Sequence, residues 1–156
     1  MDMMKKIPVR EQDPAVRATN FEEVCLGYNK EEAEAEASRC LNCKNPMCVT
    51  GCPVEIDIPG FIAQVKAGDV KGAAAVIGKS STLPAVCGRV CPQETQCEGK
   101  CIRGIKGEAV SIGKLERYVA DSARELGVKP EKASVKNGRK VAVIGSGPSG
   151  LACASD

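Results

Sequence analysis

The sequence predicts an all-α fold that is followed by the first strand and turn of a second, α/β domain. Apolar residues recur at helical spacing along most of the chain, and eight of the ten cysteines interrupt them in segments containing Pro and Gly. A single β-branched run stands apart near the C-terminus. We therefore expect a helical domain over residues 1–130. Residues 131–156 are expected to form a linker and the truncated start of the second domain.

The first elements are predicted from Pro, Gly and capping signals. Residues 1–14 are expected to form an extended arm, because Pro8 and Pro14 interrupt any helix. A helix is predicted from about residue 14 to residue 26, with Gly27 as its stop signal.

The next helix has a clear start signal. Asn29 is expected to cap it, with Glu32 completing a variant of the capping box. This Ala- and Glu-rich helix would deliver Cys40 and Cys43 at its end. Residues 42–56 are predicted to be loop, because their Pro and Gly residues exclude regular structure.

Three further helices are predicted between residues 57 and 127, each from an N-cap and apolar residues on one face. The caps are Asp57, Asp69 and Ser111. The apolar positions recur every three or four residues, at Ile58, Phe61, Ile62 and Val65, then at Val70, Ala73, Ala74 and Ile77, and finally at Ile112, Leu115, Val119, Ala123 and Leu126. Apart from the C-terminal segment, no strand is predicted.

The C-terminal segment changes character after a linker over about residues 128–138. The run Lys140–Ile144 is typical of a buried parallel strand. It leads into a G-x-G-x-x-G turn made of Gly145, Gly147 and Gly150, and then into a helix. In that context the glycines indicate a site for a dinucleotide pyrophosphate at the helix N-terminus. The sequence stops before the second strand and the ribose-binding acid, so we expect a larger protein to contain this chain.

Cysteine spacing carries the strongest functional signal. The first group reads C-x2-C-x4-C-x3-C-P and the second reads C-x3-C-P-x4-C-x3-C. Their members are Cys40, Cys43, Cys48 and Cys52, and then Cys87, Cys91, Cys97 and Cys101. Three thiolates on short loops can wrap one inorganic cluster, while a cysteine before a proline can turn to a second cluster. This spacing favours a two-cluster iron–sulfur electron-transfer domain.

Structural zinc is the main alternative, since four-cysteine zinc sites are common in cytosolic proteins. Such modules usually pair two C-x2-C knuckles, and this sequence contains one. In this alternative the chain would be a docking module without redox activity. Disulfides or free thiols are a third reading. Cys25 and Cys153 are expected to be small buried hydrophobic residues and not ligands.

Composition excludes several classes of partner. The net charge of +2 is too small to suggest binding to nucleic acid or to an anionic membrane. The sequence has no apolar run of about 20 residues, as a membrane-spanning helix needs, and no apolar signal-peptide core. A reducing cytoplasm is therefore the expected compartment. With only four aromatic residues, the chain is expected to fold around bound metal as much as around hydrocarbon.

These motifs together resemble the small-subunit family of NADPH-dependent glutamate synthases. The resemblance rests on both cysteine groups and on three stretches, C-G-R-V-C-P-Q from Cys87, S-I-G-K-L-E-R-Y from Ser111 and V-A-V-I-G-S-G-P-S-G-L-A from Val141. Related proteins are the large subunit of NADH-dependent reduced ferredoxin:NADP oxidoreductase and the N-terminal region of dihydropyrimidine dehydrogenase. The resemblance implies an α-helical ferredoxin-like domain with two [4Fe–4S] clusters, followed by FAD- and NADPH-binding domains.

The resemblance also implies a set of ligands. One cluster would be held by Cys40, Cys43, Cys48 and Cys101. The other would be held by Cys52, Cys91, Cys97 and a non-cysteine ligand that falls at Glu116, which would otherwise pass for an exposed helix residue. Cys87 would then not be a ligand, although spacing alone recruits it. Gly145, Gly147 and Gly150 would hold the FAD pyrophosphate.

The function implied by the resemblance is electron transfer. NADPH would reduce FAD, and the two clusters would pass single electrons to a partner, which in glutamate synthase is the large subunit. The present chain alone is expected to hold clusters but not to complete the reaction, because most of the flavin site and the NADPH site lie beyond it.

Overall fold

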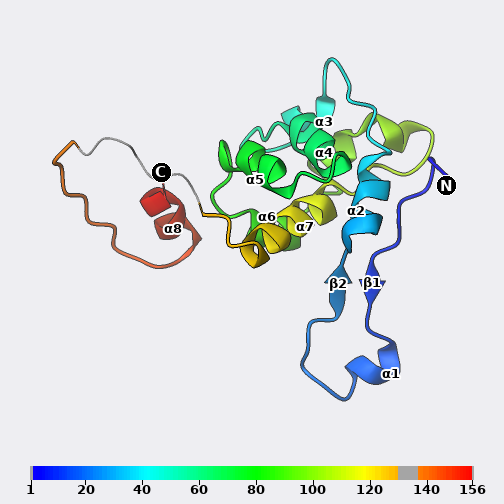
Figure 1. Ribbon diagram of the computed structural model, residues 1–156, viewed down its shortest axis with the longest axis horizontal. Helices are drawn as coiled ribbons and strands as arrows, with labels where there is room; N and C mark the ends of the chain where they lie inside the picture. The colour runs from blue at the N-terminus through cyan, green and yellow to red at the C-terminus, as the bar shows by residue number, and fades with distance from the viewer. Residues whose placement is uncertain (1, 130–136, 156) are drawn as a thin grey trace.

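The computed structural model describes residues 2–129 and 137–155, and its main body is helical (Figure 1). Helices and 3-10 turns follow one another from Lys30 to Glu125. They are α2 (Lys30–Ala37), α3 (Met47–Thr50), α4 (Ile58–Lys66), α5 (Val70–Gly78), α6 (Pro84–Val90), η1 (Glu98–Lys100), η2 (Ile102–Ile105) and α7 (Ile112–Glu125). The domain boundary predicted at residue 130 lies outside the described residues.

The predicted caps of α2, α4 and α5 are confirmed. The Asn29 side chain accepts a hydrogen bond from the Glu32 N–H and the Glu32 carboxylate accepts from the Asn29 N–H, which completes a capping box. Asp57 and Asp69 accept from the N–H groups three residues ahead. Ser111 precedes α7 as predicted, but its side chain makes no capping bond.

The hydrophobic core lies where α7 packs against α2, α4 and α5 (Figure 1). Leu115 and Val119 of α7 are almost fully buried, as are Phe61 and Ile62 of α4 and Ile77 of α5. Each such side chain stabilises the fold by roughly 1.5–3 kcal/mol through its burial. The predicted apolar faces therefore meet in one core beneath the cysteine-bearing loops.

The predicted helix over residues 14–26 is wrong. Only α1 (Pro14–Arg17) forms, and the chain then returns as β2 (Cys25–Gly27), which pairs antiparallel with β1 (Arg10–Glu11). The reason is local, because the Thr19 hydroxyl and the Asn20 amide both bond to the Val16 carbonyl. Side-chain bonds of this kind compete with helix continuation. The mostly helical body agrees with the predicted all-α class, and this two-stranded sheet is the one departure from it in the described residues.

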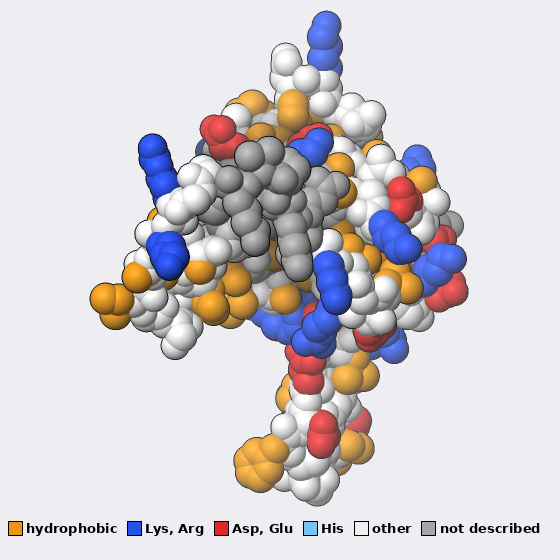
Figure 2. Space-filling model, turned by 60° about the vertical axis from the view of Figure 1, so that its left-hand side comes forward, with side chains coloured by type: hydrophobic (Ala, Val, Ile, Leu, Met, Phe, Trp, Pro, Cys, Tyr) orange, Lys and Arg blue, Asp and Glu red, His pale blue; other side chains and the backbone are white. Residues whose placement is uncertain are grey.

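This hairpin arm, residues 10–27, projects from the helical body and carries apolar atoms at its far end (Figure 2). Phe21, in the connection between α1 and β2, is fully exposed. Arg117 of α7 fastens the base of the arm, since its Nη2 donates to the Cys25 carbonyl at 2.8 Å and to the Glu23 carboxylate at 2.9 Å. Cys25, predicted to lie in a helix, is therefore a half-buried strand residue.

The C-terminal segment also differs from prediction. Residues 140–144 are exposed and form no strand, because no partner strand lies beside them within the described ranges. The predicted turn and helix do follow, as α8 (Pro148–Ser155). Gly145 has a φ of +119°, which favours glycine, and a Cβ on Gly150 would lie 2.2 Å from the Gly145 carbonyl oxygen. Cys153 is exposed, not buried as predicted.

No helix in the two described ranges combines the length and the apolar character needed to cross a membrane.

A buried ion pair joins three parts of the chain. Glu36 and Arg39 of the α2 end have no solvent exposure and pair with each other. The Glu36 carboxylate also accepts from the backbone N–H groups of Ile7 and Ser111, each at 2.8 Å. Arg39 donates to the carbonyls of Met3, Glu108 and Ala109. The N-terminal segment, α2 and the start of α7 are thereby held together.

Gly88 allows α6 to cross α7 at close range. An ideal Cβ on Gly88 would lie 2.7 Å from the Arg117 backbone nitrogen and 2.8 Å from its Cα. These contacts are with backbone and cannot be relieved by turning a side chain. Gly88 therefore sets how closely the segment between Cys87 and Cys91 approaches α7.

Replacing Glu36 with Gln is expected to lower the free energy of unfolding by about 3–5 kcal/mol, because Arg39 stays charged and buried without its carboxylate. Chemical denaturation followed by far-UV circular dichroism measures this difference. Glu34→Gln is the matched control, since Glu34 is only half-buried and its one ion-pair contact, with Lys30, is at 3.9 Å. The control should stay within about 0.5 kcal/mol of the parent chain. Equal losses in both variants would contradict a special role for the buried pair.

Replacing Gly88 with Ala is expected to cost about 1–3 kcal/mol of stability through overpacking against the α7 backbone. Gly78→Ala serves as its control, because nothing lies within 4 Å of a Cβ on Gly78. Alanine favours helix over glycine by about 1 kcal/mol, so the control should be neutral or stabilising. Thermal unfolding of both variants under one buffer makes the comparison. If Gly88→Ala unfolds at or above the temperature of Gly78→Ala, the close crossing is not needed.

Candidate metal centre

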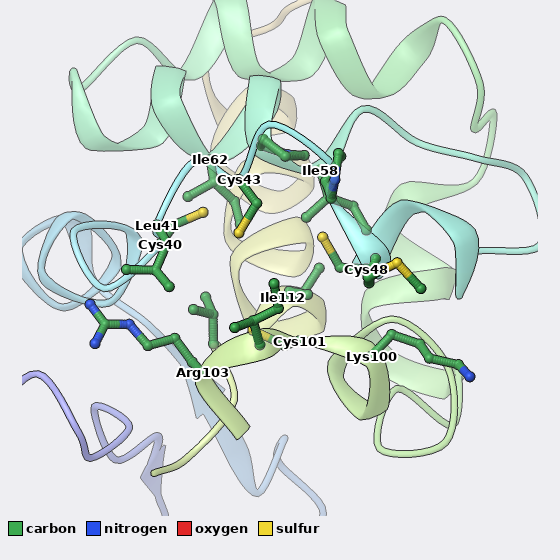
Figure 3. A pocket seen from close by; sticks show the side chains of 15 residues that line it. Cys40, Leu41, Cys43, Cys48, Ile58, Ile62, Lys100, Cys101, Arg103 and Ile112 are labelled. Atoms are coloured by element: carbon green, nitrogen blue, oxygen red, sulfur yellow. The ribbon is translucent and has the colours of Figure 1, made fainter. Parts of the chain in front are cut away.

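All ten cysteines are free thiols, and eight of them gather in two groups beside the core. The loops between helices bring each group together from segments that lie far apart in the sequence. Figure 3 shows the first group, in which Cys40, Cys43 and Cys48 lie across a pocket from Cys101.

The first pocket has an apolar floor and a cationic rim. Ile58 and Ile62 of α4 and Ile112 of α7 form much of its floor. Lys100 and Arg103 line it beside Cys101 (Figure 3). The four half-buried thiols are the only acidic groups in this lining, so the pocket offers sulfur donors in an otherwise apolar cavity.

Local backbone features place these thiols. The α2 helix ends just before Cys40, whose N–H bonds to the Ala37 carbonyl. Asn42 then adopts a φ of +48°, which turns the chain toward Cys43. The prediction that residues 42–56 are entirely loop is corrected, since Cys48 lies in the short helix α3.

A hydrogen bond between distant segments holds Cys101 opposite Cys40, Cys43 and Cys48. Cys101 lies between η1 and η2, and two residues later the Arg103 Nε donates to the Arg39 carbonyl at 2.8 Å. Because Arg39 directly precedes Cys40, this one bond ties the two sides of the pocket together.

Burial makes two thiols of this group, Cys40 and Cys48, resist ionisation. Burial raises the pKa of Cys48 to about 11, with the thiols of Cys101 and Cys40 adding to the effect. Burial also raises the pKa of Cys40, and the nearby Arg103 guanidinium acts in the opposite direction. Thiolates here need a compensating positive charge, which iron or zinc ions provide.

The second group combines Cys52, Cys91 and Cys97 with Glu116 of α7. Burial raises the pKa of Cys97 to about 12, and Glu98, Cys52 and Glu116 add negative charge around it. Burial likewise raises the pKa of Cys91 to about 11, with contributions from Cys87, Glu116 and Cys52. Cys87 lies next to Cys91, so the structure also brings this fifth sulfur to the same place. Cys87 lies in α6, which ends at Val90, and Cys91 is the C-cap of that helix.

Glu116 is the clearest sign that something belongs in this second group. Its side chain is 7% exposed, so it is not the surface residue that its sequence context alone would suggest. Its Oε1 atom is buried and has no hydrogen-bond partner. Burial raises the pKa of this carboxyl to about 7. A buried carboxylate oxygen without a partner is costly unless a cation or donor occupies the space it faces.

Two further polar side chains support this group and could not be found from spacing. Gln93 is buried and its Nε2 donates to the Cys87 carbonyl at 3.2 Å. Glu98 is buried, accepts from the Gly113 N–H and pairs with Lys6 at 3.0 Å. Their only sequence signal is adjacency to Cys91–Pro92 and Cys97, which does not predict long-range partners.

The side-chain donors of the two groups do not converge on the position of a single metal ion. Among the described residues, no three Cys, Asp or Glu side chains come close enough to hold a single metal ion as placed. The three glycines at 145, 147 and 150 are far from both cysteine groups in the sequence. Gly145 and Gly147 precede α8, and Gly150 lies in its first turn. They bring no charged side chain together, and a Cβ on Gly147 would meet nothing within 4 Å.

Comparison with known proteins supports a cluster-binding role. A family model described as dihydropyrimidine dehydrogenase domain II, 4Fe-4S cluster, matches residues 17–128. The chain is 45% identical over 140 residues to the glutamate synthase [NADPH] small chain of Escherichia coli K12, covering 89% of this chain and 30% of that protein. It is 42% identical over 154 residues to the same-named protein of Halomonas elongata, covering 95% and 33%.

A third relative has a different name. The chain is 38% identical over 131 residues to the NAD-dependent dihydropyrimidine dehydrogenase subunit PreT of Escherichia coli K12, covering 84% of this chain and 32% of that protein. The chain thus spans about a third of the length of these curated relatives, at 30%, 33% and 32%. The resemblance to glutamate synthase small chains is confirmed, and the chain belongs to the family of 4Fe-4S cluster domains that is named after domain II of dihydropyrimidine dehydrogenase.

Proposed function

We propose that this chain is the electron-transfer part of an NADPH-dependent flavin and iron–sulfur oxidoreductase of the glutamate synthase small-chain type, and that it holds two [4Fe–4S] clusters. The observation that carries the proposal is the pairing of two sulfur-rich groups, one around a pocket and one around an unpartnered buried carboxylate. The family match and the named relatives support the iron–sulfur part of it.

In this proposal Cys40, Cys43, Cys48 and Cys101 hold the first cluster. All four line one pocket, and its floor is apolar, so a cluster there would be partly shielded from solvent. Such exclusion and the number of hydrogen bonds to sulfur are the means by which a protein sets a cluster's potential. A bound [4Fe–4S] cluster supplies one-electron redox chemistry, which side chains alone cannot perform.

The second cluster is assigned to Cys52, Cys91, Cys97 and Glu116. The unpartnered Oε1 of Glu116 would then gain a positive partner, and this removes the cost of its burial. A carboxylate is a harder donor than a thiolate, so the two clusters would differ in potential and in lability. Cys87 beside Cys91 is the competing fourth donor.

The remaining parts of the proposal concern the larger protein. Gly145, Gly147 and Gly150 would hold an FAD pyrophosphate, which is supported by the strained φ of Gly145 and the close approach of Gly150 to it. The electrons would pass from NADPH through FAD and the clusters to a partner such as a glutamate synthase large subunit. The setting would be the reducing cytoplasm, where the ten cysteines stay free.

Iron and acid-labile sulfide analysis of anaerobically prepared protein tests this function. We expect about eight iron and eight sulfide per chain, from two four-iron clusters, with a brown visible spectrum that bleaches on reduction. The proposal would be contradicted by a colourless chain that binds stoichiometric zinc and that takes up no iron or sulfide under anaerobic reconstitution. That result would favour a structural zinc module instead.

Replacing Glu116 with Ala is expected to remove or alter one cluster and to leave the other intact, because only one group loses a donor. Iron content should fall toward half, and electron paramagnetic resonance of the reduced chain should retain the signal of the first cluster. Glu116→Cys should keep both clusters and shift the potential of the affected one.

Two matched variants accompany this test. Glu125→Ala changes an exposed carboxylate on the same helix and should leave both clusters unchanged. Cys87→Ala should also leave both unchanged if Glu116 is the ligand. Two normal clusters in Glu116→Ala, together with a lost cluster in Cys87→Ala, would instead make Cys87 the eighth ligand.

A further inference from the structure

The open side of the first pocket is unusually cationic. The two segments that form it, residues 41–50 and 99–107, contain no Asp or Glu. They carry four cations in a chain whose total net charge is only +2. Lys100 and Arg103 line the pocket itself, and Lys44 and Lys106 lie elsewhere in the same two segments. We call this surface the cationic mouth.

These cations differ from four arginines elsewhere in the fold. Arg10, Arg39, Arg89 and Arg117 each pair with a carboxylate. Within the part of the chain that the structure describes, none of the four cations of the mouth does so. Lys44, Lys100 and Lys106 are exposed, and Arg103 is held in place by the Arg39 carbonyl. The positive charge of the mouth is therefore available to a partner.

Exposed apolar side chains lie among these charges. Leu41, Met47 and Ile102 line the pocket and are exposed by 50%, 48% and 42%. Ile105 at the end of η2 is 78% exposed. The first three of these side chains share the pocket lining with half-buried Cys43 and Cys101. A small anion would leave this apolar surface in water, whereas a protein face would cover it.

We propose that the cationic mouth is the docking face for a redox protein whose contact surface carries carboxylates around an apolar centre. An apolar centre with a charged rim is the usual anatomy of a transient protein interface, and complementary charge mainly speeds encounter. The proposal rests on the proposed function, because docking here would place the partner directly over the first sulfur group. The simpler reading is that the cations only offset the negative charge of a bound cluster.

Two redox proteins of opposite charge can serve as probes, an acidic flavodoxin and the basic cytochrome c. The reduced, cluster-loaded chain is mixed with each oxidised probe in a stopped-flow instrument at increasing salt. Flavodoxin reduction should slow steeply as salt rises, because screening removes the attraction. Cytochrome c reduction should be flat or should speed up with salt. A flavodoxin rate that does not depend on salt would overturn the proposal.

Charge-reversal variants test whether the cationic mouth is the surface that attracts flavodoxin. The triple variant Lys44→Glu, Lys100→Glu, Lys106→Glu should cut the flavodoxin rate at low salt by at least tenfold, within the range that steering produces. The matched control reverses Lys66, Lys71 and Lys79 to Glu, which gives the same net charge but changes exposed residues of α4 and α5 and the residue after α5. An equal loss in the control would show that net charge, and not this face, attracts the partner.

Iron, sulfide and midpoint potential are measured on every variant. A slower rate with unchanged cluster content and potential supports docking, whereas a slower rate that follows a shifted potential supports the simpler reading. If the parent chain takes up no iron and sulfide, the proposed function fails. The docking face is then judged by calorimetric titration of flavodoxin, in which only the mouth variant should lose binding.

Discussion

The buried pair of Glu36 and Arg39 is the interaction on which the rest of the structure depends. It lies at the end of α2, one residue before Cys40, and it collects backbone groups from the N-terminal segment and from the residues before α7. The Arg39 carbonyl in turn holds Arg103, two residues after Cys101. Donors 61 positions apart in the sequence, Cys40 and Cys101, are thereby fixed across one pocket whose floor is part of the hydrophobic core.

Glycine solves the corresponding problem at the second group. Its donors come from three segments, and these segments approach so closely that a methyl group would overlap a neighbour at each crossing. A Cβ on Gly51 would lie 2.6 Å from the Gln96 carbonyl oxygen. A Cβ on Gly113 would lie 2.4 Å from the Gln93 side chain. The first group is therefore held together by an ion pair and hydrogen bonds, whereas the second depends on glycines that let its segments pack closely.

The parts of the fold that the sequence predicted well are those with local signals. Asn29, Asp57 and Asp69 cap their helices as expected, because a cap needs only residues a few positions away. The helix expected over residues 14–26 failed because Thr19 and Asn20 bond to the backbone within the turn. At the site, spacing singled out the eight cysteines as candidate ligands, and the structure brings four of them, Cys40, Cys43, Cys48 and Cys101, to one pocket. The burial of Glu116, Gln93 and Glu98 depends on residues far along the chain, which no local pattern contains.

The attachment of the hairpin arm links distant parts of the molecule mechanically. Arg117 grips the base of the arm through Glu23 and Cys25, and it directly follows Glu116 in α7. The residue that anchors the arm and the residue that brings a carboxylate to the second group are therefore neighbours in one turn of α7, while the exposed Phe21 lies at the other end of the arm.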